Sequence, residues 1–211
     1  MNWAHDCLRN TTTWVIGDSN ANMLYLSFLA ITGCINKTGG WPRSSMCVVQ
    51  QHGIKIIAIP HEKPIYAKLQ RADHIGSIPA VLDNINSTGK HIVFVHYYLH
   101  YTPAHPSVFY LRMKALKAAV ERLVKRNPNV LTVIRGPHAA IQDCKHNRAI
   151  GGDPLAPLYI EIIKTMFRGL ENKVLFLDGW DLTIAIESNG IHPPAFVTRE
   201  MIKIALSYFC K

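Results

Sequence analysis

Five short apolar runs recur along the chain, and a segment of helical length or pattern follows most of them. The runs lie at residues 14–16, 55–59, 91–95, 130–134 and 173–177. The run at 91–95 is apolar in succession, which is typical of a strand buried on both faces. Strands that alternate with helices favour a parallel sheet covered on both sides. We therefore expect an α/β fold: a three-layer αβα sandwich around a five-stranded parallel sheet.

Helices are predicted between these runs, at residues 23–31, 78–85, 107–126, 157–167 and 197–209. The helix at 107–126 is the clearest, because one of its faces is apolar and Asn127 and Pro128 end it. Residues 33–53 are expected to form loops, and residues 60–76 are expected to be irregular. No repeat, low-complexity tract or linker divides the sequence, so a single domain over residues 1–211 is predicted.

The first apolar run stops abruptly at Gly17, Asp18 and Ser19, and a helix-length apolar stretch follows. A serine in such a turn lies at the carboxyl end of a parallel strand, where open α/β sheets bind ligands. It also lies at a helix N-terminus, whose free N–H groups can hold an oxyanion. Gly17 permits the sharp turn, and Asp18 is expected to brace it. The alternative is that Ser19 or Asn20 only caps the helix.

A serine hydroxyl needs a base to become nucleophilic near neutral pH, and that base is most often histidine. The chain has 11 histidines, but the base must lie at the same edge of the sheet as Ser19. His192 meets this condition, because it lies in the connection between the last strand and the last helix. Pro193 and Pro194 restrict the backbone of that connection. We predict a Ser19–His192 pair; the alternative is an exposed loop histidine.

The order of these motifs resembles the SGNH (GDSL-type) hydrolase superfamily and, more closely, the PC-esterase domain of the NXPE (neurexophilin and PC-esterase) family. The residues that carry the resemblance are 17–19, 100–103 and the closing block from Asp178 through His192 to Cys210. The resemblance implies a flavodoxin-like sandwich with Ser19 as nucleophile and His192 as base. From the sequons and cysteines we further expect the chain to be the C-terminal part of a longer protein, with contacts to an N-terminal region.

The position that orients the histidine departs from the superfamily pattern. An aspartate normally stands three residues before the histidine, and this chain has Asn189 there. An asparagine carbonyl can accept the imidazole N–H bond, but it cannot stabilise imidazolium by charge. Asp181 is the first candidate for a substitute acid and Glu187 the second. The alternative for Asp181 is a structural role in capping a turn.

The resemblance also implies an oxyanion hole made of the Ser19 N–H, a glycine and a third donor. Gly76 fits the glycine by position, and Gly53 is the alternative. The asparagine expected after the third strand is missing, and His100 takes its place as a donor or a substrate contact. Tyr101 is a further substrate-binding candidate, because an aromatic edge suits a sugar ring. The aromatic residues there could equally pack under the loop; they are His96, Tyr97, Tyr98 and Tyr101.

By resemblance, the expected function is serine-dependent transfer of an O-acyl group, most simply acetyl, to a carbohydrate such as sialic acid. Acetyl-CoA would be the donor, and no tightly bound cofactor is expected. The first alternative is a carbohydrate O-acetylesterase. The second is a glycan- or protein-binding module with weak or no catalysis, which Asn189 favours. A flavin or nucleotide binder would need a phosphate-cradling glycine loop, which the sequence lacks.

Cysteines and glycosylation motifs indicate the compartment. The three sequons begin at Asn10, Asn36 and Asn86. The five cysteines lack the Cys-x-x-Cys spacing of a zinc or thioredoxin-type site, so no metal is expected. We predict the secretory pathway, in the Golgi lumen or outside the cell, with Cys7–Cys210 as the first disulfide to test. Residues 1–6 do not form a signal peptide. The alternative is a reducing cytosol with free cysteines and unused sequons.

The formal charge of +9 comes from 23 basic and 14 acidic residues. The basic residues on the helix at 107–126 are expected to form a solvated outer face; they are Lys114, Lys117, Arg122, Lys125 and Arg126. Attraction to anionic glycans or a phosphate-bearing donor is the weaker interpretation. No nucleic-acid-binding motif is present, and no apolar run reaches the ~18–20 residues of a membrane span.

Overall fold

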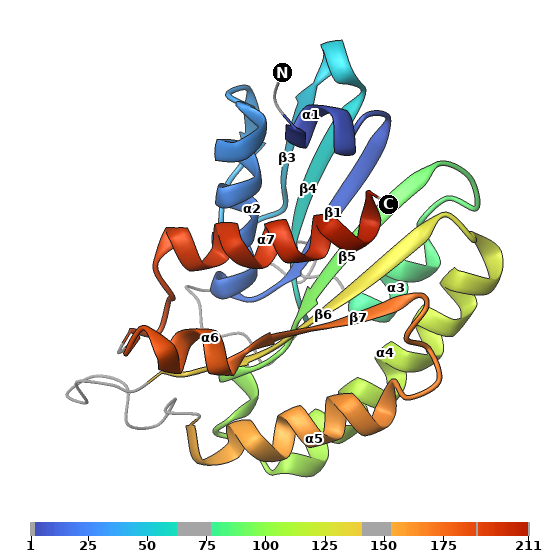
Figure 1. Cartoon of the computed structure of the whole chain (residues 1–211). Coiled ribbons are helices and arrows are strands. Elements are labelled where there is room, and N and C mark those ends of the chain that lie inside the picture. The colour runs from blue at the N-terminus through green and yellow to red at the C-terminus, as the bar shows by residue number, and fades with distance from the viewer. Residues whose placement is uncertain (1–2, 63–76, 141–152, 189, 211) are drawn as a thin grey trace.

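The computed structural model describes residues 3–62, 77–140, 153–188 and 190–210. Its centre is a seven-stranded sheet in the order β2-β3-β4-β1-β5-β6-β7 (Figure 1). The strands are β1 (Thr11–Gly17), β2 (Lys37–Gly39), β3 (Ser45–Val49), β4 (Ile54–Pro60), β5 (Lys90–His96), β6 (Val130–His138) and β7 (Val174–Gly179).

The five predicted strands form the parallel part of the sheet, β4-β1-β5-β6-β7. The prediction of a five-stranded sheet was wrong only at its edge. Residues 37–49, expected to be loops, form the short strands β2 and β3, which pair antiparallel with each other and with β4. Strand β2 is exposed along its whole length and β3 is only five residues long, so pairing with a neighbour defines them more than their own pattern does.

Helices cover both faces of the sheet, as predicted (Figure 1). On one face, α2 (Ser19–Thr32) and α7 (Ala195–Phe209) share a core with the sheet. On the other face, α3 (Ile78–Asp83), α4 (Pro106–Arg126) and α5 (Ala156–Met166) form a second core. The described residues also contain two short helices, α1 (Trp3–Cys7) and α6 (Trp180–Ala185), and 3₁₀ turns at 50–52, 99–101 and 153–155. The three-layer sandwich is therefore confirmed.

Two disulfides join segments of the described chain. Cys7 at the end of α1 is bonded to Cys210 after α7, which confirms the predicted pair. Cys34 is bonded to Cys47, which ties the end of α2 to strand β3. Cys144 lies outside the described residues. Within the described ranges, no helix is both long enough and apolar enough to cross a membrane.

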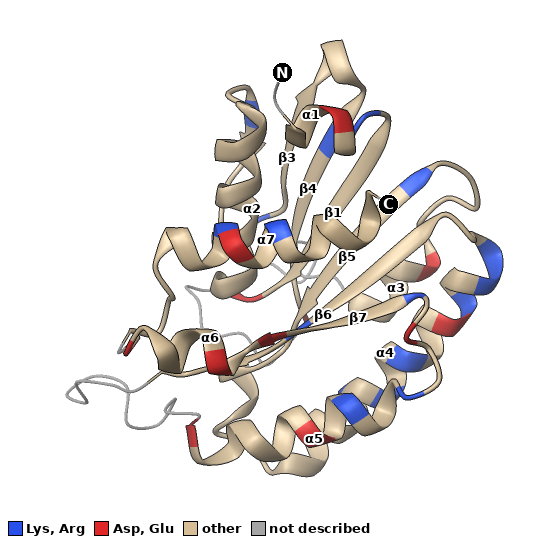
Figure 2. Cartoon of the chain, viewed as in Figure 1, with Lys and Arg blue, Asp and Glu red and all other residues tan. Residues whose placement is uncertain are grey.

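Basic residues recur along α4 (Figure 2), and Lys114, Arg122 and Lys125 are exposed. Several of them have structural partners: Arg122 forms a fork with Asp83, with contacts of 2.9 and 2.7 Å. Arg126 donates to the carbonyl oxygens of Leu82 and Ile85. These contacts attach α4 to α3, so this part of the positive charge serves packing and solvation rather than a bound anion.

Candidate active site

The turn between β1 and α2 presents Ser19 at the carboxyl edge of the sheet. Strand β1 ends at Gly17, Asp18 is the N-cap, and Ser19 is the first residue of α2. The Asp18 carboxylate accepts hydrogen bonds from the N–H groups of Asn20 at 2.7 Å and Ala21 at 3.3 Å. Asp18 therefore braces the turn as predicted. It does not take up the N–H of Ser19, which is the donor of this turn suited to a substrate oxygen.

Gly17 is required by the close packing beneath this turn. A Cβ at position 17 would lie 2.5 Å from the carbonyl oxygen of His96 and 2.8 Å from the Cβ of Ala21. The first contact is with the neighbouring strand and the second with α2, so neither atom can move without shifting an element of the fold. Only glycine permits β1 to turn into α2 at this separation.

The structure brings Ser19 and His192 together although 173 residues separate them. The Oγ of Ser19 lies 2.8 Å from the Nε2 of His192, which is hydrogen-bond distance. His192 lies in the connection from α6 to α7, directly before Pro193 and Pro194. This contact is the geometry of an alcohol and the base that accepts its proton.

Of the proposed orienting residues, Asn189 lies outside the described residues, so its role stays a prediction. Asp181 lies in the first turn of α6 and is exposed. Within the described part of the chain, no ion pair or side-chain hydrogen bond joins it to His192, so the structure does not bring these two residues together. Glu187 is an exposed turn residue with a φ of 52°. The pKa of His192 is lowered below its usual 6.5. Burial is the largest cause and Arg135 acts in the same direction, whereas the negative charge of Asp18 raises the pKa.

Of the two glycines proposed for the oxyanion hole, Gly76 lies outside the described residues. Gly53 is at the wrong end of the sheet: it precedes β4, and a Cβ there would meet the side chain of Asn10. Since Ser19 follows the carboxyl end of β1 and β4 is parallel to β1, residues that precede β4 lie at the opposite edge. The Gly53 alternative is therefore excluded by the topology.

His100 lies under the site in a defined tautomer. His61 Nδ1 contacts the carbonyl oxygen of Glu62, and His61 Nε2 lies 2.9 Å from His100 Nδ1. A carbonyl only accepts, so His61 carries its proton on Nδ1 and its Nε2 accepts from His100 Nδ1–H. A neutral His100 then has its lone pair on Nε2. The ring is therefore an acceptor at Nε2 rather than the oxyanion donor that the sequence suggested.

Tyr101 does not face a substrate in this structure, because none of its surface is exposed. Its ring packs against His61, Tyr97 and Phe109. Tyr97 and Tyr98 are also buried, at 2% and 0% exposure. The alternative stated from the sequence, that these aromatic residues pack under the loop, therefore holds for the three tyrosines. Their rings contact His61 and His96.

A buried charged cluster, made of Asp18, His61, His96, Arg135 and His138, was missed by sequence reasoning. Burial would raise the pKa of Asp18, but the charges of His96, His100, His61 and Arg135 lower it well below 3.8. Burial lowers the pKa of Arg135 to about 10 and those of His61 and His96 to about 4. At neutral pH the cluster therefore holds one carboxylate, one guanidinium and neutral imidazoles. The only available signal was that each of these residues ends or follows a predicted strand.

Trp41 and Arg43 also reach the nucleophile turn from the connection between β2 and β3. They line a small crevice together with Gly17, Asp18 and Asn22. Arg43 is exposed, and within the described residues it forms no ion pair. Because the sequence predicted loops here, it did not indicate that this connection reaches the turn between β1 and α2.

The sandwich, the strand–turn–helix that presents Ser19 and the late histidine loop define the class as an SGNH-type α/β domain. Comparison with known proteins then shows the family. Residues 1–210 match the family described as "NXPE family member 4-like, C-terminal domain", and the chain belongs to this family. The recognition made from the sequence is confirmed.

Two solved structures are similar over most of their length. One is described as a GDSL-like lipase from Parabacteroides merdae, with 11% identity, a TM-score of 0.48, and coverage of 95% of this chain and 96% of that one. The other is described as a nucleolar GTP-binding protein 1 from Plasmodium falciparum, with 12% identity, a TM-score of 0.36, and coverage of 95% and 90%.

Proposed function

We propose that this domain transfers an O-acyl group, most simply acetyl, to a carbohydrate hydroxyl through an ester of Ser19. The observation that carries the proposal is the 2.8 Å contact between Ser19 Oγ and His192 Nε2 at the carboxyl edge of the sheet. His192 takes the proton of Ser19 as Oγ attacks the acyl carbonyl, and the Ser19 N–H stabilises the oxyanion. The protonated His192 then gives its proton to the departing group, which leaves the acyl group on Ser19.

In the second half-reaction, His192 removes a proton from the acceptor hydroxyl, which attacks the Ser19 ester and regenerates the free serine. A sugar as acceptor makes the protein a transferase, and water makes it an O-acetylesterase. Trp41 beside the nucleophile turn supports a sugar acceptor, since an aromatic face stacks on a sugar ring. The exposed guanidinium of Arg43 supports an anionic group on a substrate, such as the carboxylate of a sialic acid or the phosphates of acetyl-CoA.

The electrostatics support base catalysis by His192. Burial, offset in part by Asp18, lowers the pKa of His192 below 6.5, so the ring is neutral and able to accept a proton at neutral pH. In place of a directly bonded aspartate, the buried and ionised Asp18 supplies negative charge that stabilises the imidazolium formed during attack. This arrangement explains how catalysis can proceed with asparagine at position 189.

The proposed compartment is the secretory pathway, in the Golgi lumen or outside the cell. Its support is two disulfides, Cys7–Cys210 and Cys34–Cys47, since disulfides persist in oxidising compartments. Two sequons also fit: Asn36 and Asn86 and the hydroxyl residues that complete their motifs are exposed. Asn10 is also exposed, but its side chain lies close to Gly53 and its motif continues into the central strand β1, where Thr11 is buried.

Labelling with a fluorophosphonate probe tests the chemistry. We expect a single adduct on Ser19, lost in Ser19→Ala, and at least about 10²-fold slower in His192→Gln, since general-base catalysis contributes roughly 10²–10⁴-fold. The labelling rate of the wild type should rise with pH to a plateau, with its midpoint below 6.5 because His192 must be neutral. Labelling that is absent or unaffected by Ser19→Ala would instead favour the non-catalytic glycan- or protein-binding module.

The choice between the two reactions is tested with unlabelled enzyme whose Ser19 is acetylated. An acetylated Ser19 intermediate, formed from acetyl-CoA or an aryl acetate, would be mixed with a sialoside or with buffer alone. Acetyl transfer to the sugar, faster than release of acetate to water, supports the transferase; equal release with and without the sugar supports the esterase.

A further inference from the structure

Arg135 is the most deeply buried charged side chain of the sheet, with no exposed surface. It lies near the carboxyl end of β6, and its charge is compensated only at a distance: Asp18 acts on it electrostatically, but within the described residues no carboxylate forms an ion pair with it. A buried guanidinium is costly unless its donors are used. Its hydrogen bonds therefore indicate what it does.

One arm of Arg135 holds the nucleophile turn. Its Nη1 donates to the carbonyl oxygen of Asn20 at 3.0 Å, and Asn20 directly follows Ser19. The bond holds the first turn of α2 in addition to the Asp18 cap. The backbone of Arg135 is held in turn by His96, whose Nδ1–H donates to the Arg135 carbonyl at 3.1 Å.

The other arm leads to the histidine loop. Arg135 Nη2 lies 3.4 Å from His138 Nδ1, and His138 Nε2 lies 2.9 Å from the carbonyl oxygen of Ile191. Since a guanidinium only donates and a carbonyl only accepts, His138 accepts at Nδ1 and donates from Nε2. Both bonds require the same neutral tautomer. Ile191 directly precedes His192, so the chain of bonds ends one residue from the base.

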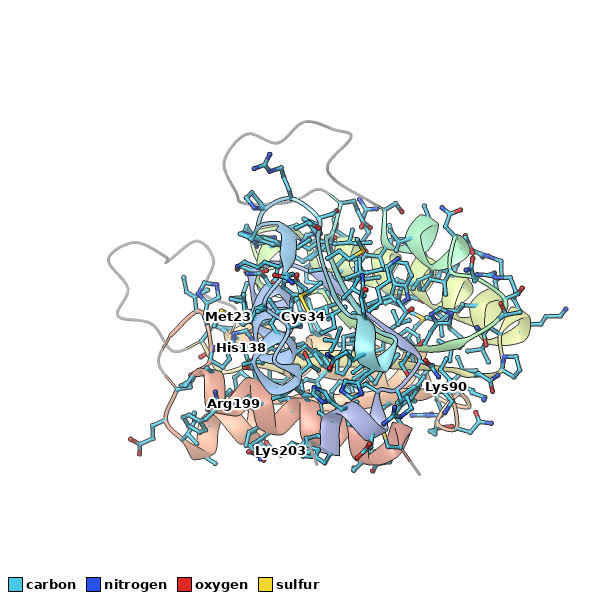
Figure 3. All side chains as sticks on the ribbon, turned by 90° about the horizontal axis from the view of Figure 1, so that it is seen from above. Met23, Cys34, Lys90, His138, Arg199 and Lys203 are labelled. Carbon is cyan, nitrogen blue, oxygen red and sulfur yellow. A yellow bond between two sulfur atoms is a disulfide. The ribbon has the colours of Figure 1, made fainter. Side chains whose placement is uncertain are left out.

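We propose that Arg135 and His138 form a positioning pair that holds the His192 loop against the Ser19 turn. The expected effect on catalysis at Ser19 rests on the proposed function, whereas the hydrogen bonds that hold the loop do not depend on it. The hydrogen bond between Ser19 and His192 is exposed. The bonds of the pair are better shielded: those from Arg135 to Asn20 and to His138 are buried, and the one from His138 to Ile191 is part-buried. Figure 3 shows His138 at the end of the molecule opposite to Lys90, which begins β5.

His91 provides a matched control. It is also a buried histidine that accepts at Nδ1, from Trp14 Nε1 at 3.3 Å, and donates from Nε2 to a carbonyl, that of Thr88 at 2.9 Å. It differs in place, because it lies at the start of β5, at the edge of the sheet away from Ser19. Replacing each histidine by phenylalanine removes the same two bonds and keeps a ring of similar size.

The experiment compares His138→Phe and His91→Phe by fluorophosphonate labelling and by hydrogen exchange of residues 186–196. We expect His138→Phe to slow the labelling step about 10²-fold, the effect of a misplacement of about 1 Å, with little change in the probe concentration needed for half-saturation. Exchange of the loop should rise. His138→Gln, whose amide can still donate to Ile191, should recover most of the rate, and His91→Phe should label as the wild type does.

Equal effects of the two phenylalanine variants on labelling, or unchanged exchange of the loop in His138→Phe, would overturn the proposal. A wild type that is not labelled at Ser19 would refute the proposed function alone, because the exchange comparison still decides whether His138 holds the loop. If His138→Phe does not fold, the ¹⁵N chemical shifts of the His138 ring in the wild type show which tautomer it adopts. An Nε2–H tautomer at His138 supports the proposal, and an Nδ1–H tautomer refutes it.

Discussion

Mild acid should destabilise this fold strongly, because the cluster beneath the site holds its histidines neutral. Burial, opposed by the charge of Asp18, lowers the pKa of both His61 and His96 from 6.5 to about 4. Protonation therefore favours the unfolded chain, whose histidines titrate near 6.5. Stability is lost as the pH falls below 6.5, and the loss is complete near the folded pKa of about 4.

The size of the loss follows from the two pKa values. At pH 5 an unfolded histidine is almost fully protonated, whereas a folded one with a pKa of about 4 is mostly neutral. Each of the two then contributes about 2 kcal/mol of lost stability between pH 7 and pH 5, or about 4 kcal/mol together. That is a large share of the ~5–15 kcal/mol that stabilises a typical domain. His100, His138 and His192 shift in the same direction and add to it.

Urea unfolding at pH 7, 6 and 5 would measure this effect. The wild type should lose about 4 kcal/mol or more, and His96→Asn, whose amide can still donate to the Arg135 carbonyl, should lose about 2 kcal/mol less over the same interval. His105→Asn is the control, since His105 is an exposed N-cap of α4. Asp18 does not enter, because its carboxylate stays ionised throughout this range. Equal free energies of unfolding at pH 5 and pH 7 would refute the reasoning.

Three further predictions concern the turn, the disulfides and the sequons. Gly17→Ala should abolish Ser19 labelling and lower the unfolding free energy by roughly 1–3 kcal/mol, as overpacking does, because the added methyl meets the His96 carbonyl; unchanged labelling would contradict the packing argument. Removing the Cys7–Cys210 disulfide, which spans 203 residues, should lower the unfolding free energy by about 5 kcal/mol, and removing Cys34–Cys47, which spans 13, by about 3 kcal/mol. The difference comes from the loop entropy of the unfolded chain and is measured by urea unfolding; the reverse order would argue against an entropic origin. In secreted protein, Asn36→Gln and Asn86→Gln should each remove one glycosidase-sensitive mass and Asn10→Gln none; a glycan on Asn10 would show that its packing against Gly53 is not maintained.

The local sequence was enough to predict the layers and the nucleophile turn. Parallel strands buried on both faces need long apolar runs, and the five runs were therefore visible without any knowledge of their neighbours. The turn at Gly17, Asp18 and Ser19 depends on residues adjacent in the chain, so its cap could be anticipated as well. His192 was reached by one further step, because parallel topology requires the connection after the last strand to lie at the same edge as Ser19.

What the sequence could not determine depends on contacts between distant segments. Strand β2 is polar and exposed, and β3 is only five residues long. They are strands because β4 offers a free edge and Cys34–Cys47 holds β3 there. The tautomers of His100 and His138 follow from partners 39 and 53 residues away. The sequence predicted that Asp18 caps the helix. Its electrostatic effect on the pKa of His192 could not be predicted, because it depends on the burial of Asp18 among residues from four strands. Chain patterning thus determines which segments form the layers, whereas burial and long-range hydrogen bonding decide where charge and protons lie, because the energy of a charge depends on its three-dimensional surroundings.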